Sequence, residues 1–269
     1  MKNLCIHTIT TKGWDFATAC EAYSKAGITG ISIWQDAIEQ LSVQETRQIL
    51  QDSNLEVVSY VRGGFFAHAS ATERAKAIDQ NKQMIDEAAE ISAPSLVLVC
   101  GADPGQSLER SRGQIRDGIE AIVPHAAQRG VKLSIEPLHP MYAGARSAIN
   151  SMASANEMAE KIDSPWVGIA IDVYHVWWEP NLQNEIARCG NNNNLFAYHI
   201  CDWKVPTEHL LLDRGLMGEG CIPIQQITNW VTEAGFNGYE EVEIFSTKYW
   251  EMDQQTWLNM IIMAYADLK

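Results

Sequence analysis

The chain has 269 residues, of which 46% are hydrophobic and 20% charged, and it is long enough to bury a sizeable core as one large domain. Its formal net charge of −14 argues against nucleic acid or an anionic membrane as a partner, because those surfaces select patches of lysine and arginine. We therefore expect a protein that acts on a small neutral or cationic molecule.

The cysteine spacing and the lengths of the apolar runs indicate the cellular compartment of the protein. The cysteines form no Cys-x-x-Cys pair and no regular spacing, so neither a zinc knot nor a disulfide framework is indicated. The opening residues lack a signal-peptide cleavage pattern, and no apolar run approaches the roughly 20 residues of a membrane span. We expect reduced thiols and a cytoplasmic protein. The cysteines are Cys5, Cys20, Cys100, Cys189, Cys201 and Cys221.

Short β-branched runs alternate with longer helical patterns from one end of the chain to the other. Strands are predicted over 3–9, 28–34, 55–61, 95–100, 131–136, 166–172, 195–200 and 239–245. Helices are predicted over 15–26, 43–53, 71–91, 107–129, 151–162, 181–189, 223–234 and 253–267.

Eight strand-then-helix units indicate a parallel sheet, which closes most simply into a single (β/α)₈ TIM barrel over residues 1–269. The first strand is not followed by a Gly-x-Gly-x-x-Gly motif, so a doubly wound dinucleotide-binding fold loses its best support. We expect no nucleotide cofactor.

Barrel strands alternate between the interior and the helix-facing side, where side chains must be apolar. In the last four predicted strands, this alternation predicts that one set of side chains faces the helices: Val131, Leu133, Ile135, Val167, Ile169, Ile171, Phe196, Tyr198, Ile200, Val242 and Ile244. It turns the alternate set inward: Lys132, Ser134, Glu136, Gly168, Ala170, Asp172, Leu195, Ala197, His199, Glu241 and Glu243.

The inward set brings Glu136, Asp172, His199 and Glu243 to the carboxyl ends of four strands, the face where barrel enzymes build their sites. Singly, each could be a helix cap, half of a salt bridge or a hydrogen-bonded core residue. Together, three carboxylates would repel one another unless they were protonated or bound a cation. This mostly oxygen donor set suits one divalent metal ion, with Mn²⁺ favoured, Mg²⁺, Co²⁺ or Fe²⁺ as alternatives, and Zn²⁺ less suited.

The same segments resemble a known family. The matching stretches are "SIEPLHP", "IAIDVYH", "AYHICDW", "DRGLMGEGCIPI" and "EEVEIFS", in order along the C-terminal half. Together they resemble the xylose isomerase-like barrels, in particular the sugar phosphate isomerase/epimerase group that includes the ketose 3-epimerases and inosose dehydratase relatives.

The resemblance implies that Glu136, Asp172, His199 and Glu243 bind one catalytic metal ion. It also implies that Glu136 and Glu243 carry protons and that His175 hydrogen-bonds substrate oxygens. A metal that holds the carbonyl and adjacent hydroxyl of a sugar stabilises the enediolate left by removal of the α-proton. The implied activity is that of an isomerase or epimerase acting on a carbohydrate.

Two positions depart from the pattern of the ketose 3-epimerases. Where that family carries a substrate-contacting arginine shortly after the seventh strand, this chain has Val205, and the nearest arginine is Arg214. Where the family has a glutamate six residues after the fifth-strand ligand, this chain has Tyr142. Both departures weaken the case for 3-epimerisation of a free ketose.

Several further residues fall near strand ends and are candidate substrate contacts: His7, Trp34, His68, His139, Trp178 and Arg214. Tryptophan faces can stack on a sugar ring, and Trp177, Trp203 and Trp250 are placed similarly, although packing is the alternative for each. Arg214 and Lys204 are surface charges or substrate anchors. Asp202 is a candidate support for His199 or the metal. "MGEG" at 217–220 indicates a loop with special backbone geometry, with Gly-rich phosphate binding as the alternative.

Other functions use the same residues. A lyase would eliminate a leaving group from a keto-inositol or 3-keto-glycoside after α-proton removal. An endonuclease IV-like enzyme shares the Asp-x-x-His spacing of Asp172 and His175, but it needs more histidines and a basic groove, which a charge of −14 opposes. A non-catalytic sugar-binding barrel would need no metal. A homodimer or homotetramer is compatible with each.

Overall fold

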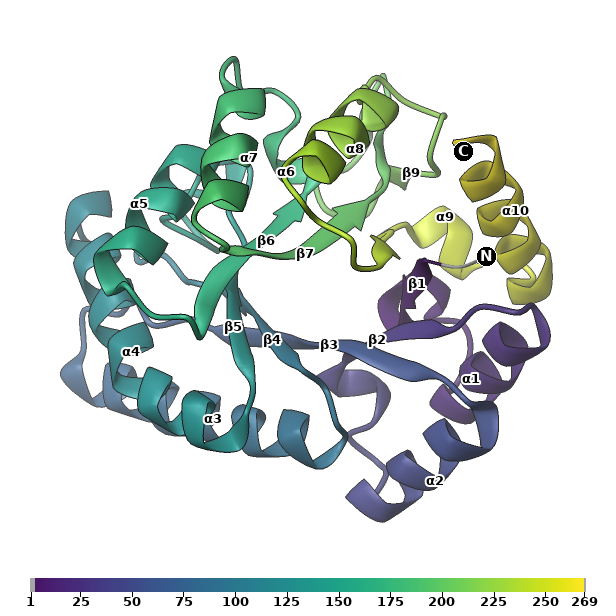
Figure 1. The fold of residues 1–269 in the computed structure, drawn as a ribbon, viewed down its shortest axis with the longest axis horizontal. Helices are drawn as coiled ribbons and strands as arrows, with labels where there is room; N and C mark the ends of the chain where they lie inside the picture. Colours follow the sequence, from purple (N-terminus) through teal and green to yellow (C-terminus); the bar gives the residue numbers. More distant parts are fainter. Residues whose placement is uncertain (1–2, 269) are drawn as a thin grey trace.

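A computed structural model describes residues 3–268, so the ends of the predicted domain, residues 1–2 and 269, lie outside the described residues. Eight parallel strands in this range form a closed barrel in the order β1-β10-β7-β6-β5-β4-β3-β2, which confirms the predicted TIM barrel (Figure 1). The strands are β1 (Leu4–His7), β2 (Gly30–Trp34), β3 (Glu56–Gly64), β4 (Ser95–Val99), β5 (Lys132–Ile135), β6 (Val167–Asp172), β7 (Leu195–Ile200) and β10 (Glu240–Val242).

Long helices alternate with these strands and surround the barrel (Figure 1). They are α1 (Phe16–Lys25), α2 (Val43–Ser53), α3 (Ala71–Glu90), α4 (Leu108–Arg129), α5 (Met152–Ile162), α7 (Leu182–Asn191), α8 (Ile224–Glu233) and α10 (Gln254–Asp267). Each coincides with a predicted helix to within two residues. Among the described residues, no helix is both long and apolar enough to cross a membrane.

Short elements follow several strands, and the sequence patterns did not predict them. They are η1 (Thr8–Thr11), η2 (Gln35–Ala37), η3 (Pro140–Tyr142), α6 (Val173–Val176), α9 (Thr247–Trp250) and a two-stranded antiparallel pair, β8 (Asp202–Trp203) with β9 (Arg214–Gly215). Two strands are consequently shorter than predicted. β1 ends at His7 because the next residues turn into η1, and β10 ends at Val242 rather than at residue 245.

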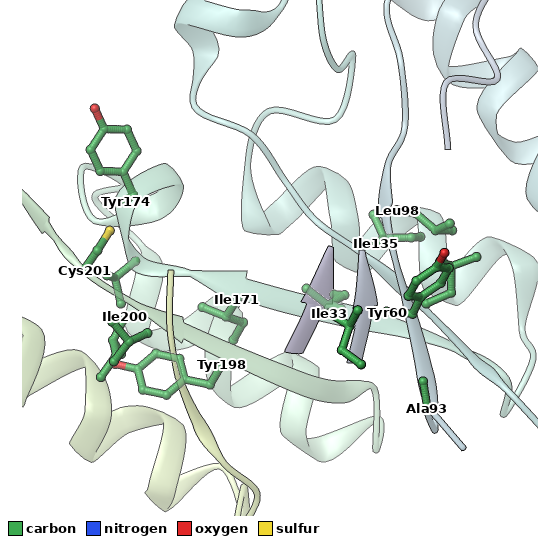
Figure 2. Packing of buried hydrophobic residues seen from close by; sticks show 14 of the residues in the cluster. Ile33, Tyr60, Ala93, Leu98, Ile135, Ile171, Tyr174, Tyr198, Ile200 and Cys201 are labelled. Carbon is green, nitrogen blue, oxygen red and sulfur yellow. The ribbon is translucent and has the colours of Figure 1, made fainter. Parts of the chain in front are cut away.

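Apolar side chains form a large outer core and a small inner one. The outer core lies between sheet and helices, and Figure 2 shows Ile171, Tyr198 and Ile200 from β6 and β7 among its members. The inner core consists of Val61, Val97, Ala170 and Ala197, with Trp34 packed against it. These inner residues are mostly small, which leaves room inside the barrel for polar side chains.

One part of the predicted alternation is wrong. Leu195 packs against the outer core, whereas Phe196, predicted to face the helices, lies against the Lys132 ammonium at 4.3 Å from its ring centre. The strand register explains this difference, because Ile169 pairs with Leu195 but Ala170 pairs with Ala197, leaving Phe196 as an extra residue in β7. A bulge of this kind reverses which face the preceding residues occupy.

Glu179, in the loop before α7, ties that loop to the start of α5. Its Oε1 accepts a hydrogen bond from the Met152 backbone N–H at 2.5 Å. Burial, together with the nearby Glu185 charge, raises the pKa of Glu179 from 4.5 to about 7 despite this bond. The folded protein therefore holds a proton that the unfolded chain has lost between these two values, so this carboxyl lowers stability as the pH rises through that window.

We expect Glu179→Gln, which keeps the acceptor and removes the titration, to reduce the loss of stability between about pH 4.5 and pH 7. Urea unfolding of wild type and variant at about pH 5 and pH 8 measures this difference. Glu157→Gln, at an exposed position on α5, is the matched control and should leave the pH dependence unchanged. An unchanged pH dependence in Glu179→Gln would contradict the raised pKa.

Candidate metal centre and active site

Four ionisable side chains converge at the carboxyl end of the barrel. Glu136 follows β5, Asp172 ends β6, His199 lies on β7 and Glu243 follows β10, and these four strands are adjacent in the barrel. One ligand atom from each lies within 4.8 Å of the other three, and all four residues are buried. The convergence predicted from strand alternation is therefore present.

The donor set fits a single divalent cation. The Nδ1 atom of His199 lies 3.2 Å from Glu136 Oε1 and 4.0 Å from Glu243 Oε2, so this nitrogen faces the carboxylates. Ligand atoms about 2.0 to 2.4 Å from one central ion would lie no more than about 4 to 5 Å apart, which agrees with the observed spread. Three carboxylates and one imidazole are donors that Mg²⁺ and Mn²⁺ accept.

Arg214 lies inside this cluster. Its Nη1 is 2.8 Å from Asp172 Oδ2 and 3.1 Å from Glu243 Oε2, and its Nη2 is 3.1 Å from His175 Nε2. The backbone of Arg214, on β9, donates to the Phe245 carbonyl and so holds the side chain next to the end of β10. Because Arg214 is only 2% exposed, it is not the surface charge that was one of its two predicted roles.

The charges of the cluster shift its protonation. Burial alone would raise the pKa of Glu243, but His7, Arg214 and His199 hold that pKa well below its usual value. Burial raises the pKa of Asp172 to about 6, although Arg214 opposes the shift. Burial alone would lower the pKa of His199, yet the surrounding glutamates raise it to about 10. Cationic side chains therefore balance carboxylates that would otherwise repel one another.

A second layer of polar residues lies deeper in the barrel. Glu241 Oε2 accepts hydrogen bonds from Ser32 Oγ at 2.5 Å and Ser59 Oγ at 3.1 Å, and it lies 3.1 Å from His7 Nε2. The other ring nitrogen of His7 is 3.0 Å from Glu243 Oε1. His7, predicted as a substrate contact, is thus a buried bridge between the two glutamates, and it positions Glu243.

His175 lies at the edge of the cluster. Its Nε2 faces the Arg214 guanidinium and is 3.6 Å from Asp172 Oδ2. Burial and the Arg214 charge hold the pKa of His175 well below its ordinary value, so the ring is neutral near pH 7 and can accept the Arg214 hydrogen bond. The ring of Tyr142, the residue that replaces the family's glutamate, meets His175 edge-on at 5.8 Å.

Aromatic rings form one wall beside His175. The His139 ring lies 5.2 Å from Trp203 and 5.7 Å from Trp178, and Trp203 stacks on Tyr174 at 4.6 Å. The Trp178 indole N–H donates to the His175 carbonyl at 2.8 Å. Trp177 packs near Trp203 as part of the same group. His139 and Trp178, both predicted substrate contacts, are therefore brought together with His175.

A cavity of about 770 Å³ is lined in part by Trp34, Phe245 and Trp250. The Trp34 indole nitrogen is 3.2 Å from His7 Nδ1, which places this cavity next to the cluster. His68 is half-buried, and its carbonyl accepts a hydrogen bond from Arg74. Within residues 3–268, no hydrogen bond, ion pair or ring contact joins His68 to the cluster, so the structure does not bring this candidate to the site.

The model of the xylose isomerase-like TIM barrel family matches residues 20–260. The chain belongs to this family. Inosose isomerase from Halalkalibacterium halodurans is 21% identical over 221 residues, which are 80% of this chain and 75% of that protein. The crystal structure of protein SMc04130 from Sinorhizobium meliloti 1021 is 42% identical, with a TM-score of 0.96, and the match covers 99% of this chain and 98% of that one.

A third structure is similar in fold. The IOLI protein, solved with a binding zinc atom, has a TM-score of 0.87 and 19% identity, and the match covers 99% of this chain and 97% of that one. The family membership confirms the resemblance that the strand-end motifs indicated.

The Asp202 carboxylate holds the loop after β7, which differs from its predicted role. Asp202 was a candidate support for His199 or the metal, but it accepts backbone hydrogen bonds at 2.9 to 3.0 Å from three residues of the following loop. The three residues that donate to Asp202 are Gly218, Gly220 and Ile222.

The special backbone of "MGEG" is confirmed, because Gly218 has φ +92° and a Cβ at Gly220 would lie 2.2 Å from a backbone oxygen. Lys204 pairs with Asp213 in this loop.

We expect Arg214→Met to lower the free energy of unfolding of the metal-free protein by about 3 to 5 kcal/mol, because it leaves two buried carboxylates without their shared donor. Adding Asp172→Asn to that variant should recover part of the loss, since one uncompensated charge is removed. Urea unfolding in the presence of a chelator measures both.

Arg188→Met is the matched control, because its ion pair with Glu160 is about one third exposed and should contribute about 1 kcal/mol or less. If Arg214→Met were no more destabilising than Arg188→Met, the buried arrangement around Arg214 would be refuted.

Proposed function

We propose that this chain is a divalent-metal-dependent isomerase or epimerase that moves a proton α to a carbonyl in a sugar or sugar derivative. The observation that carries this proposal is the cluster of Glu136, Asp172, His199 and Glu243 at the mouth of the barrel. Membership of the xylose isomerase-like family supports it, as does the similarity to a protein named inosose isomerase. A divalent cation held by the four side chains would supply Lewis acidity, polarising the substrate carbonyl so that a weak carboxylate base can remove the neighbouring proton.

Glu136 and Glu243 have different surroundings, which suits different steps of proton transfer. Glu243 has His7 on one oxygen and Arg214 on the other, so it is ionised and can act as the base. Glu136 reaches the cluster from β5, on the far side of β6 and β7 from β10. Two carboxylates on opposite flanks of a substrate can remove a proton from one face and return one to the other, which inverts a centre.

The neighbouring residues orient the substrate. His175 is neutral and 3% exposed, and Arg214 holds its Nε2 toward Asp172. A neutral imidazole and a guanidinium beside the reacting carbonyl can hydrogen-bond sugar hydroxyls and stabilise developing negative charge on oxygen. The aromatic wall of His139, Trp178 and Trp203 offers flat apolar faces that restrict water.

Purified protein should contain about one divalent ion per chain, with Mn²⁺ favoured over Mg²⁺, Co²⁺ and Fe²⁺. We expect Glu243→Gln to retain much less metal, because it removes one anionic ligand. Elemental analysis after growth with each metal, followed by gel filtration, measures this content. Wild type that holds no divalent ion under any of these conditions would eliminate the metal centre.

Incubation with D-fructose, D-tagatose or keto-inositols in D₂O should introduce deuterium next to the carbonyl of at least one substrate, as read by NMR. Glu136→Gln and Glu243→Gln should each slow this exchange by about 10²- to 10⁴-fold, the usual contribution of a general acid or base. Glu120→Gln, on the exposed face of α4, is the control and should exchange at the wild-type rate.

Two experimental outcomes would contradict this proposal and support a different function. Release of a leaving group from a keto-inositol or 3-keto-glycoside, together with exchange, would assign the same residues to a lyase. Metal-loaded protein that exchanges none of the neutral substrates or their phosphorylated and acidic derivatives would leave a non-catalytic barrel.

A further inference from the structure

Two arginines, Arg62 and Arg146, line the 770 Å³ cavity beside the cluster. Their guanidinium groups lie against aromatic rings: Arg62 is 5.6 Å from the centre of Trp34 and 5.0 Å from that of Phe65, and Arg146 is 5.7 Å from that of Tyr142. Within residues 3–268, neither guanidinium donates a hydrogen bond or forms an ion pair. Both are half-buried in the cavity lining, and Asp36, which lines the same cavity, acts on Arg62 through its charge without forming an ion pair with it.

A bulge in β3 explains the position of Arg62. Val61 pairs with Val97 and Gly63 pairs with Leu98, so Arg62 is an extra residue with no partner on β4. Val61 faces the barrel interior, while a Cβ at Gly63 would meet Leu96 and Leu98 on the helix-facing side. Arg62 therefore lies where the strand changes face, and bulges commonly re-aim a side chain in this way next to active sites.

Backbone hydrogen bonds hold Arg146 on the loop after β5. The Gly101 N–H donates to the Arg146 carbonyl and the Ala148 N–H donates to the Gly101 carbonyl, both at 2.9 Å. The Arg146 N–H donates to the carbonyl of Tyr142, whose ring also touches His175. Arg146 is thus fixed between the end of β4 and a histidine of the candidate site.

Two residues of the cavity wall contact side chains that neighbour the cluster. Trp34 contacts His7, and the ring of Phe245 lies 5.1 Å from the Arg214 guanidinium. Burial and the Arg146 charge lower the pKa of Arg62, while the carboxylates of Asp36, Glu136 and Glu243 act on it in the opposite direction. Both arginines therefore line a cavity whose wall touches His7 and Arg214.

Other charged groups face the same cavity: Lys12, Asp36 and Glu87. Lys12 is exposed and lies over Trp250, which adds positive charge. Glu87 Oε2 already accepts the Tyr60 hydroxyl at 2.7 Å, and Asp36 is exposed at the rim. The half-buried part of the cavity holds two arginines and one carboxylate, Glu87, so it carries a net positive charge although the whole chain is strongly acidic.

We propose that Arg62 and Arg146 bind an anionic group of the substrate, a phosphate ester or a carboxylate, while the cluster acts on the carbonyl end. This inference rests on the proposed function and narrows its substrate class to acidic sugar derivatives. It differs from the expectation of a neutral or cationic ligand, which used the net charge of the whole chain. Guanidinium groups bind both kinds of anion through charge-assisted hydrogen bonds.

Three ligands that differ at one carbon test this proposal: D-fructose, D-fructose 6-phosphate and D-fructuronate. Calorimetric titration of the metal-loaded protein in about 0.15 M salt, which screens non-specific attraction, gives each Kd. We expect at least one charged ligand to bind about tenfold or more tightly than D-fructose, because hydrogen bonds between guanidinium groups and an anion are charge-assisted and about twice as strong as neutral ones. The tighter of the two identifies the anion as phosphate or carboxylate.

Arg62→Gln and Arg146→Gln should each reduce the preference for the charged ligand over D-fructose by about tenfold. Arg62→Lys and Arg146→Lys keep the charge and should retain part of the preference. Arg116→Gln, at an exposed position on α4, is the matched control and should keep the wild-type ratio. Circular dichroism confirms that each variant is folded.

The proposal is overturned if neither charged ligand binds more tightly than D-fructose, including the case in which no ligand binds. It is also overturned if the preference persists in the Arg62→Gln/Arg146→Gln double variant. Deuterium exchange distinguishes this failure from that of the proposed function. If the protein exchanges deuterium but shows no preference for charged ligands, only the arginine subsite is refuted. If it prefers charged ligands through the arginines but exchanges no deuterium, only the proposed catalytic function is refuted.

Discussion

The repulsion among buried carboxylates at the mouth of the barrel is the constraint on which the rest of this site depends. Glu136, Asp172 and Glu243 meet there with almost no access to solvent, and such a group of anions is costly unless positive charge lies among them. His199 and Arg214 supply that charge within the protein. The carboxylates are therefore compensated by side chains of the protein itself, so the cluster can remain folded without a bound cation.

The same constraint accounts for the polar layer beneath the cluster. His7 joins Glu243 to Glu241, and Ser32 and Ser59 donate to Glu241 in turn, so a second buried carboxylate is satisfied by fixed donors. Small side chains line the barrel at this depth, which leaves space for these contacts. His7 consequently fixes the orientation of Glu243 from the interior of the barrel.

Strand alternation and helix periodicity were sufficient to predict the barrel, the helix bounds and the convergence of the four cluster residues. They failed where a strand contains an extra residue, because a bulge reverses the alternation without leaving a local pattern. Phe196 departs from the predicted face for this reason, and the sequence around Arg62 carries no pattern that indicates its position. Glu241 was correctly turned inward, but its role depends on contacts with β1, β2 and β3 that no single segment reveals. Arg214 and Asp202 lie in or beside a long loop, where sequence patterns carry little information about burial.

The bulge in β3 also bears on how proteins with this barrel diverge. Deleting one residue there would let the two strands pair without interruption, and Arg62 would be lost from the cavity, while β5, β6, β7 and β10 would keep their places on the other side of the barrel. Insertion or deletion of a single codon in one strand can thus change which side chain lines the cavity without disturbing the cluster. The lining of the cavity can therefore vary while the four cluster residues stay the same.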